Sequence, residues 1–389
     1  MEELFLTTQL NRKKNFIFMI ECSKCVMNDT IREFSLNSKG VCNFCEDWEK
    51  KKDYFTNFTD EQIKKNLNSI KSEIKKFNKK NNYDCIIGLS GGTDSSYVTY
   101  LAFKMKLKPL IIHMDNGWNS KISNSNINKI LEKTNFDYKT LILNWKEFKD
   151  LQISFLKAGV PDIEILTDHA IFAYIINFAL ENNIKYILSG VNFATEHSTI
   201  PSWGWRKDDF SHIKKIHKKF GKEKLITFPK MYPFKKFYYE KIKKKIKVIN
   251  LLDFINYKSI KAKEILKTNF DWDDYGGKHH ESFFTKFFQG YILPKKFKID
   301  KRLLHLSCLI RNNEINRNEA VQELKMPNLD TQKTLEYENF IKKKLSLSDD
   351  EFKSIMLSKP NKHSDYSLDI YNNFIINKIM NITKRILIK

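Results

Sequence analysis

The stretch YDCIIGLSGGTDSSYVTYLAF, residues 83–103, decides the fold class that we predict for this chain. Strand-forming residues run from Cys85 to Leu89, a Ser-Gly-Gly turn follows, and the residues from Asp94 to Met105 are typical of a helix. Backbone N–H groups of a glycine turn at a helix N-terminus form an anion site without any cation. The turn is therefore either a simple bend or a phosphate-binding loop.

The residues around the turn favour phosphate. Ser90, Ser95 and Ser96 add hydroxyl donors that a purely structural turn does not need. Asp94 would repel a phosphate unless it holds Mg²⁺, which is a reason for an acid at this position. The spacing is neither that of a Walker A loop nor that of a dinucleotide-binding G-x-G-x-x-G turn.

Strand and helix patterns alternate from Tyr83 to about Pro233. Strands are predicted at 85–89, 110–114, 138–143 and 186–188, and helices at 94–105, 124–134 and 168–181. This alternation predicts an α/β domain with a parallel sheet covered on both faces. Ligands of such sheets bind at the carboxyl ends of the strands. The segments SGGTDSS, HMDNGW and SGVNFATEH all fall at those ends.

The sequence divides into four parts. We predict a Cys-bearing module over 1–50, a linking helix over 51–82, the α/β domain over 83–233 and a mostly helical region over 234–389. Ser348 and Glu351 form a predicted capping box at the start of a late helix.

Four of the six cysteines form two C-x-x-C pairs. These are Cys22 with Cys25 and Cys42 with Cys45, separated by 16 residues. Such pairs bring four thiolates to one tetrahedral Zn²⁺ and leave no open position, so we predict a structural zinc ribbon. Accidental pairs of buried cysteines and a rubredoxin-like iron site are the alternatives. Cys85 and Cys308 are expected in the core.

The formal charge of +22 raises nucleic acid or an anionic membrane as partners. The basic residues are nearly all Lys rather than Arg, which indicates solvated surfaces more than a nucleic-acid footprint. No run of ~18 apolar residues exists, so no transmembrane segment is expected. The apolar stretch Phe16–Ile20 is too short for a secretory signal, and we predict a cytoplasmic protein.

The loop resembles the PP-loop of the ATP-pyrophosphatase superfamily, whose pattern is S-G-G-x-D-S. Enzymes of that superfamily split ATP between the α- and β-phosphates and bind the leaving pyrophosphate on the loop. The resemblance implies a Rossmann-like ATP-binding domain, Mg²⁺ at Asp94, and catalytic roles for Ser90 and Asp94. The residues that it assigns to ATP on the loop are Ser90, Gly91, Gly92, Asp94, Ser95 and Ser96.

Two further strand ends are candidates for the same pocket. His113, Asp115 and Asn116 follow one strand, and the resemblance places this strand end near the adenosine. A lone His at a strand end is also commonly structural. Ser189, Gly190 and Asn192 end a later strand and are expected to line the pocket.

Two polar clusters lie outside the sheet. One contains Gly276, Gly277, Lys278, His279 and Glu281, in which Gly-Gly allows close backbone approach and the last three offer an anion site and an acid/base pair. The alternative is a solvated turn before a core helix.

The second cluster follows a strand end and is expected to bind substrate. Tryptophan faces stack on sugars or bases and Arg grips anions, although a hydrophobic lid is equally consistent. Its members are Glu196, His197, Trp203, Trp205 and Arg206. Asp168 is expected as a helix N-cap.

The cysteine quartet, the loop and the block YGGKHHESFFTKFFQGYILPKKFKIDKRLLHLSCLI, residues 275–310, together resemble the N-acetyl sugar amidotransferase family. That family makes acetamidino sugars, including pseudaminic and legionaminic acid derivatives and lipopolysaccharide O-antigen sugars. The resemblance implies ATP-driven adenylation of an N-acetyl oxygen, followed by attack of ammonia.

No glutaminase is visible in the chain, since position 2 holds Glu2 rather than a nucleophilic Cys. The resemblance therefore implies ammonia from a separate glutaminase, similar to that of histidine biosynthesis, together with a cyclase-like companion.

Two other functions remain open. A tRNA-thiolation enzyme fits the charge and the zinc knuckles, but such enzymes use extra cysteines in the PP-loop domain, where only Cys85 lies. A non-enzymatic zinc-ribbon nucleic-acid binder has no use for a pyrophosphate site.

Overall fold

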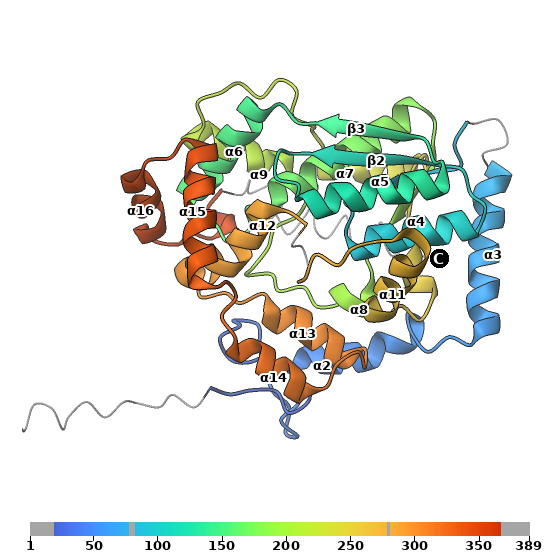
Figure 1. Cartoon of the computed structure of the whole chain (residues 1–389), viewed down its shortest axis with the longest axis horizontal. Coiled ribbons are helices and arrows are strands. Elements are labelled where there is room, and N and C mark those ends of the chain that lie inside the picture. The colour runs from blue at the N-terminus through green and yellow to red at the C-terminus, as the bar shows by residue number, and fades with distance from the viewer. Residues whose placement is uncertain (1–18, 78–81, 278–280, 367–389) are drawn as a thin grey trace, which may run out of the picture.

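The computed structural model describes residues 19–77, 82–277 and 281–366 (Figure 1). Its centre is a five-stranded sheet in the order β3-β2-β1-β4-β5, in which every neighbouring pair is parallel. The strands are β1 Cys85–Gly88, β2 Pro109–Asp115, β3 Tyr138–Ile142, β4 Tyr186–Ser189 and β5 Lys247–Asn250. The predicted α/β class with a parallel sheet is confirmed, and the strand order is that of a doubly wound fold.

The central strands are apolar runs because both of their faces are buried. Ile87 of β1 pairs with Ile111 of β2 on one side and with Leu188 of β4 on the other. The strand order reverses between β1 and β4, which is the point where ligands of such sheets bind. The glycine loop follows β1 directly and so lies at that point.

Helices cover both faces of the sheet (Figure 1). One core joins the sheet to α3 Asp60–Phe77, α4 Thr93–Lys104, α5 Lys121–Thr134 and α11 Ser259–Phe270. Isoleucines on the opposite face of β1 and β2 pack on α7 Ile165–Glu181. The helices α6 Trp145–Ala158 and α9 Phe210–Phe220 join the largest core, which continues into the C-terminal helices.

The C-terminal helices lie at the carboxyl ends of the strands. In Figure 1 the arrowheads of β2 and β3 point towards α12 and α15. The elements are α12 Phe283–Phe287, a π-helix Phe288–Phe297, α13 Arg302–Arg311, α14 Arg317–Lys325, α15 Thr331–Leu345 and α16 Asp349–Leu357. The predicted helical C-terminal region and the capping box of Ser348 and Glu351 are confirmed.

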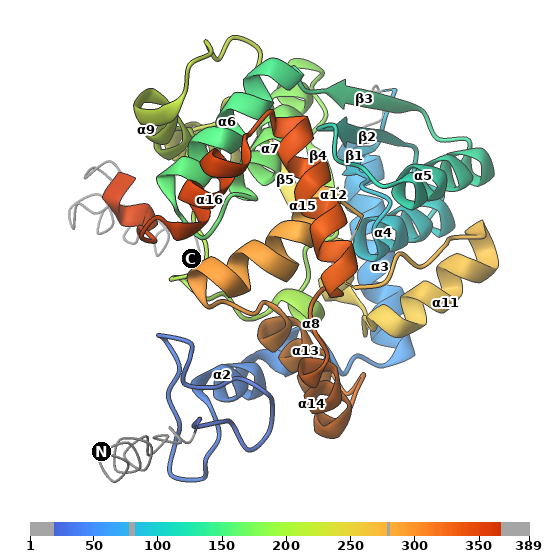
Figure 2. The same ribbon diagram turned by 60° about the vertical axis from the view of Figure 1, so that its left-hand side comes forward.

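The N-terminal module, residues 19–51, packs on these C-terminal helices (Figure 2). It ends in α2 Asn43–Lys51. The backbone N–H of Val26 donates to Ser307 Oγ at 3.3 Å, and Arg317 Nε donates to the carbonyl of Cys25 at 3.1 Å. The N-terminal module is therefore attached to α13 and α14.

The predicted helix around residue 168 starts earlier than expected. α7 begins at Ile165 with Glu164 as its N-cap, so the prediction of Asp168 as N-cap is wrong. The apolar Ile165 and Leu166 are fully buried, and their packing extends the helix by one turn. Asp168 instead pairs with Lys207 at 3.1 Å.

The elements that were not predicted include α6 and β5. α6 is capped by the side chain of Asn144 at its start and by Gly159 in the left-handed conformation at its end. β5 lies beyond residue 233 but belongs to the same sheet as β4.

Short elements complete the described chain. They are the helices α8 Phe193–Glu196 and α10 Pro233–Phe237, a π-helix Tyr238–Ile242, and 3₁₀ turns at Lys52–Tyr54, Leu251–Phe254 and His363–Tyr366. Within the described residues, no helix combines the length and the apolar character needed to cross a membrane.

Candidate active site at the carboxyl edge of the sheet

The glycine loop is fixed at Gly91. Its φ of +80° is a left-handed conformation, and an added Cβ would lie 2.4 Å from the carbonyl oxygen of Ser123. Only glycine fits a position with both of these demands. The Gly91 carbonyl accepts hydrogen bonds from Trp272 Nε1 at 3.1 Å and from Asn126 Nδ2 at 3.4 Å. These contacts set the direction of the loop before α4 begins.

Backbone N–H groups of the loop donate hydrogen bonds to side-chain hydroxyl groups. Thr93 N donates to the Tyr275 hydroxyl at 3.0 Å, and Gly92 N donates to Ser90 Oγ at 3.2 Å. Ser90 N donates in turn to Ser95 Oγ at 3.2 Å. Phosphate oxygens accept the same kind of hydrogen bond, so these donors at the start of α4 suit an anion.

The bare α-carbon of Gly92 leaves a cradle in the loop. A Cβ there would meet Ser90 Oγ at 3.1 Å, Glu281 Oε1 at 3.2 Å and the Tyr275 hydroxyl at 3.3 Å. Glu281 and Asp94 thus both bring a carboxylate to the loop. Two carboxylates beside N–H and hydroxyl donors fit a phosphate that arrives with a divalent cation.

Asp94 is held by a buried tyrosine. The Tyr257 hydroxyl donates a short hydrogen bond to Asp94 Oδ1. Burial, followed by the Asp94 carboxylate, raises the pKa of Tyr257 well above its ordinary value, so the phenol keeps its proton and remains a donor. The Tyr257 carbonyl accepts from Asn312 Nδ2 at 2.9 Å, which connects this contact to α13.

Sequence reasoning missed the three aromatic residues Tyr257, Trp272 and Tyr275. Burial, with the nearby Glu281 carboxylate, also raises the pKa of Tyr275. The only sequence signal was the aromatic pair in DWDDYGG, directly before the predicted Gly276-Gly277 cluster. Tyr257 carries no motif.

A cleft of about 430 Å³ opens beside the loop, which is within the usual size of small-molecule sites. Thr93 and Asp94 line one side, and Gly276 and Gly277 lie between that side and the C-terminal helices. The C-terminal part of its lining comprises Gln289, Gly290, Asp300, Lys301, Arg302, His305, Leu306, Leu309, Glu323, Met326, Pro327 and Asn328. Lys301 pairs with Glu164 at 2.9 Å and Arg302 with Asp300 at 2.7 Å.

The C-terminal wall of this cleft carries a recognisable family signature. Residues 281–380 match the C-terminal domain of WbpG-like lipopolysaccharide biosynthesis proteins. The match confirms the resemblance to lipopolysaccharide biosynthesis proteins that the sequence predicts. We call the described part of it, residues 281–366, the WbpG-like region.

Comparison with the curated proteins gives no match. Three solved structures align at low TM-scores, which establish no shared fold. An NH3-dependent NAD synthetase from Campylobacter jejuni is 14% identical, with 69% of this chain and 99% of that chain covered and a TM-score of 0.29. An NMN synthetase from Francisella tularensis is 16% identical, with 58% of this chain and 96% of that chain covered and a TM-score of 0.29. The third structure is the U34-tRNA thiolase NcsA from Methanococcus maripaludis with its [4Fe-4S] cluster. It is 14% identical, with 83% of this chain and 88% of that chain covered and a TM-score of 0.34.

The end of β4 contacts the start of α4. A Cβ on Gly190 would lie 3.1 Å from Ser95 N and from the backbone carbon of Asp94, so the two segments are in contact. Ser189 Oγ accepts from Val191 N at 3.1 Å. The Asn192 side chain caps α8 by accepting from Thr195 N at 2.8 Å.

The residues at the end of β2 have structural partners. His113 Nδ1 donates to the Leu89 carbonyl at 2.9 Å, and Nε2 accepts from Asn119 at 3.0 Å. Burial lowers the pKa of His113, so the ring is neutral. Asp115 accepts from Gly117 N at 2.8 Å, and Asn116 Nδ2 donates to Thr167 Oγ1 at 3.1 Å.

The predicted substrate residues after β4 do not line the cleft in the described structure. Of this segment, the cleft lining includes Thr195 but none of Glu196, His197, Trp203, Trp205 and Arg206. Glu196 ends α8. Trp203 is buried in the core, and Arg206 pairs with Asp208 at 3.1 Å.

His197 and Trp205 have structural partners. His197 lies against Trp48 and Phe193, and burial lowers its pKa to about 4. Trp205 Nε1 donates to Asp209 at 3.1 Å. Substrate contact by this segment therefore stays a prediction, as does the role of Lys278 and His279, which lie outside the described residues.

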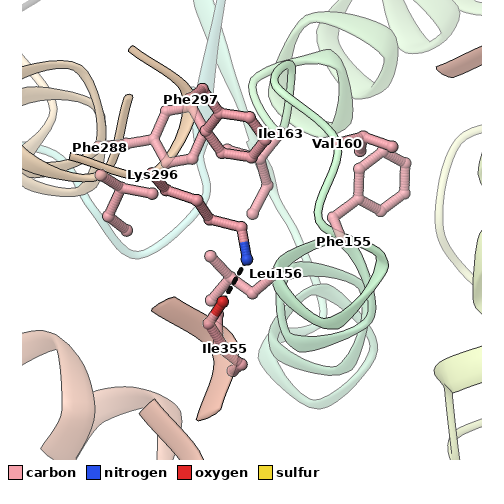
Figure 3. Close-up of a pocket in the computed structure, with 9 residues that line it drawn as sticks. Phe155, Leu156, Val160, Ile163, Phe288, Lys296, Phe297 and Ile355 are labelled. Atoms are coloured by element: carbon pink, nitrogen blue, oxygen red, sulfur yellow. Dashed lines mark hydrogen bonds between the residues drawn. The ribbon is translucent and has the colours of Figure 1, made fainter. Parts of the chain in front are cut away.

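A second, smaller pocket in the WbpG-like region surrounds Lys296 (Figure 3). Its apolar lining includes Phe155, Phe288 and Ile355. Lys296 Nζ donates a short hydrogen bond to the Ile355 carbonyl and another to Ser358 Oγ at 2.7 Å. A cavity of about 10 Å³ holds about one water, so this lysine caps α16 rather than lining a ligand site.

The four cysteines of the N-terminal module form a closed cluster. Their sulfur atoms lie within 4.8 Å of one another, with Cys22–Cys45 at 3.9 Å and Cys25–Cys42 at 3.7 Å. A zinc tetrahedron with bonds of ~2.3 Å has edges of ~3.8 Å. Cys22 Sγ accepts from Lys24 N and Cys42 N, as a metal-bound thiolate does. The cluster therefore fits zinc, and its position against α13 and α14 makes the site structural.

We expect the purified protein to carry about one zinc per chain, measured by elemental analysis. Cys42→Ser should lose the zinc and lower the melting temperature, because the free energy of zinc binding then no longer stabilises the folded module. Cys85→Ala is the matched control, since Cys85 is equally buried in β1 but distant in sequence from the cluster. Retained zinc in Cys42→Ser would contradict the site.

Gly91→Ala should mainly reduce stability, whereas Gly92→Ala should mainly weaken ATP binding. We expect Gly91→Ala to lower the free energy of unfolding by at least ~2 kcal/mol in urea, because its Cβ meets backbone at a positive φ. Gly92→Ala, at a φ of −75°, should cost less than ~1 kcal/mol but weaken ATP binding by filling the cradle. Equal stability losses in the two variants would contradict this geometry.

Proposed function

We propose that the protein is an ATP-dependent amidotransferase that converts the N-acetyl group of a bacterial surface sugar to an acetamidino group. One observation carries the proposal. A single cleft is lined on one side by the glycine loop and on the other by the WbpG-like region. A phosphate-binding loop beside a region typical of lipopolysaccharide biosynthesis supports ATP-driven chemistry on a sugar.

In this proposal the loop binds the leaving pyrophosphate of ATP. The N–H groups of Gly92 and Thr93 turn from the hydroxyls of Ser90 and Tyr275 to phosphate oxygens. Asp94 would hold the Mg²⁺ that accompanies ATP, with Glu281 as the second carboxylate at the loop. Fixed donors and a cation aimed at the departing charge are the usual means of stabilising phosphoryl and nucleotidyl transfer.

The chemistry balances without a covalent enzyme intermediate. The oxygen of the N-acetyl amide attacks the α-phosphate of ATP, and the bond to the β-phosphate breaks, releasing pyrophosphate. The amide becomes an O-adenylated imidate, whose carbon accepts ammonia. Proton loss and departure of AMP then leave the acetamidino group. Holding the two reactants in one cleft supplies much of the rate enhancement, because orientation is fixed in advance.

Ammonia comes from a separate glutaminase, accompanied by a cyclase-like protein, in this proposal. One side chain beside the loop and one in the cleft can receive the protons released as ammonia adds. Glu281 lies beside the loop, and His305 lines the opposite wall.

The cysteines weigh against tRNA thiolation as the alternative. Thiolation enzymes of this superfamily use catalytic or cluster-binding cysteines, and such cysteines must be accessible to sulfur or to a metal cluster. Four cysteines form the zinc cluster, and Cys85 and Cys308 are completely buried. Burial also raises the pKa of Cys85, which makes its thiol less reactive.

The experiment combines ATP, ammonium chloride and candidate N-acetylated nucleotide- or lipid-linked sugars. We expect AMP and pyrophosphate only when sugar is present, with a product about one mass unit lighter because O is replaced by NH. Asp94→Asn should reduce turnover by at least about 100-fold while keeping zinc content unchanged. Formation of ADP and phosphate would refute the proposal, and sugar-independent turnover with tRNA would favour thiolation.

Tyr257→Phe tests how Asp94 is held. The ring packing is kept and only the hydroxyl donor is lost, so we expect the Mg²⁺ concentration for half-maximal turnover to rise by about 10-fold with unchanged melting temperature. Tyr97→Phe is the control, since the Tyr97 ring lies 5.7 Å from that of Tyr257 and its hydroxyl does not bond to Asp94 in the described structure. An equal shift in both variants would refute a specific role for the hydroxyl.

A further inference from the structure

A lysine-rich helix lies at the edge of the sheet opposite the cleft. α10 and the π-helix that follows it form one continuous helix, Pro233–Ile242, which precedes β5. Residues 235–247 contain seven lysines and one acid, Glu240. The lysines are Lys235, Lys236, Lys241, Lys243, Lys244, Lys245 and Lys247.

Large apolar side chains lie among these lysines on the outside of the molecule. Phe234 is 73% exposed and Ile242 is 54% exposed. Tyr238 lies midway between them in sequence, half-buried, with Lys243 Nζ 5.7 Å from its ring centre. Spacings of four residues place side chains on one face of a helix. The outward face is therefore an apolar stripe flanked by lysines.

The inner side of the same helix is firmly attached. Pro233 is buried, and Lys236 Nζ lies 4.7 Å from the ring centre of Phe172 on α7. Lys235 Nζ donates to Asn177 Oδ1 at 2.9 Å, also on α7. The exposure of Phe234 and Ile242 is thus a property of an ordered helix, and neither residue is needed for its attachment.

The amino ends of neighbouring strands extend this basic surface. Lys247 opens β5, Lys185 precedes β4, and Lys108 precedes β2. In a parallel sheet these ends share one edge, and the glycine loop lies at the other. Lysines and the cleft therefore face in opposite directions.

We propose that this face binds the surface of an anionic lipid bilayer, with Phe234 and Ile242 in the interfacial zone and the lysines at the headgroups. An apolar stripe with flanking lysines is the pattern of helices that lie in the plane of a membrane. Each lysine near an anionic surface strengthens binding by about 5-fold. The segment contains no Arg, the residue that nucleic-acid sites favour, and the exposed Ile242 has no aromatic ring on which a base could stack.

Binding in this orientation leaves the cleft open to solvent. The protein would be held near lipid-linked sugars while its cleft stays accessible. The attachment is peripheral and reversible, because it rests on screened charges and two inserted side chains.

Flotation of the full chain with vesicles tests the proposal. We expect binding to phosphatidylcholine vesicles that contain one-third phosphatidylglycerol, no binding to phosphatidylcholine alone, and release at about 0.5 M salt. Changing Lys243, Lys244 and Lys245 together to Gln should weaken binding by about 10-fold or more. Phe234→Ser should also weaken it, through lost insertion, with no change in melting temperature.

A matched control changes three exposed lysines of α15 and α16, Lys333, Lys343 and Lys353, to Gln. This variant has the same net charge as the first and should bind vesicles like the unaltered protein. Equal loss in both triple variants would overturn the proposal, since binding would then follow net charge alone. Binding that is indifferent to Phe234→Ser and equally strong to polyglutamate would overturn it in favour of an acidic protein partner.

Discussion

The carbonyl of Gly91 is the fixed point on which the candidate site depends. Trp272 and Asn126 both donate to it, and the backbone of Ser123 lies too close for any side chain at this position. The loop, α5 and the segment after α11 are thereby locked together. Because a peptide unit is planar, the anchored Gly91 carbonyl also fixes the direction of the Gly92 N–H, which belongs to the same unit.

The site is divided between two parts of the chain. The sheet supplies donors for an anion, and the WbpG-like region supplies a wall with Lys301, Arg302 and His305. Tyr257 and Asn312 connect them, since one holds Asp94 and the other holds Tyr257 from α13. A substitution in the helical region can therefore alter the position of Asp94 without contacting the substrate.

Much of the fold could be predicted because its signals are local. The buried strands are apolar runs, and the glycine turn follows β1 directly. The two cysteine pairs lie close together in sequence and form one cluster. The partners of the loop could not be predicted, because Tyr257, Trp272 and Tyr275 come more than 150 residues later and carry no spacing rule. His197 has a strand-end position typical of a site residue, yet Trp48 from the zinc module buries it. The helix α6 had usable signals in Asn144 and Gly159.

The docking of the N-terminal module on α13 and α14 has a consequence for the order of assembly. Val26 and Ser307 are 281 residues apart, and Cys25 and Arg317 are 292 residues apart. During synthesis the module leaves the ribosome long before the helices that cover it. Contacts this distant in sequence form late. Until then only contacts within the module can hold it, and a zinc ion at the four cysteines would stabilise it in the nascent chain before those helices arrive.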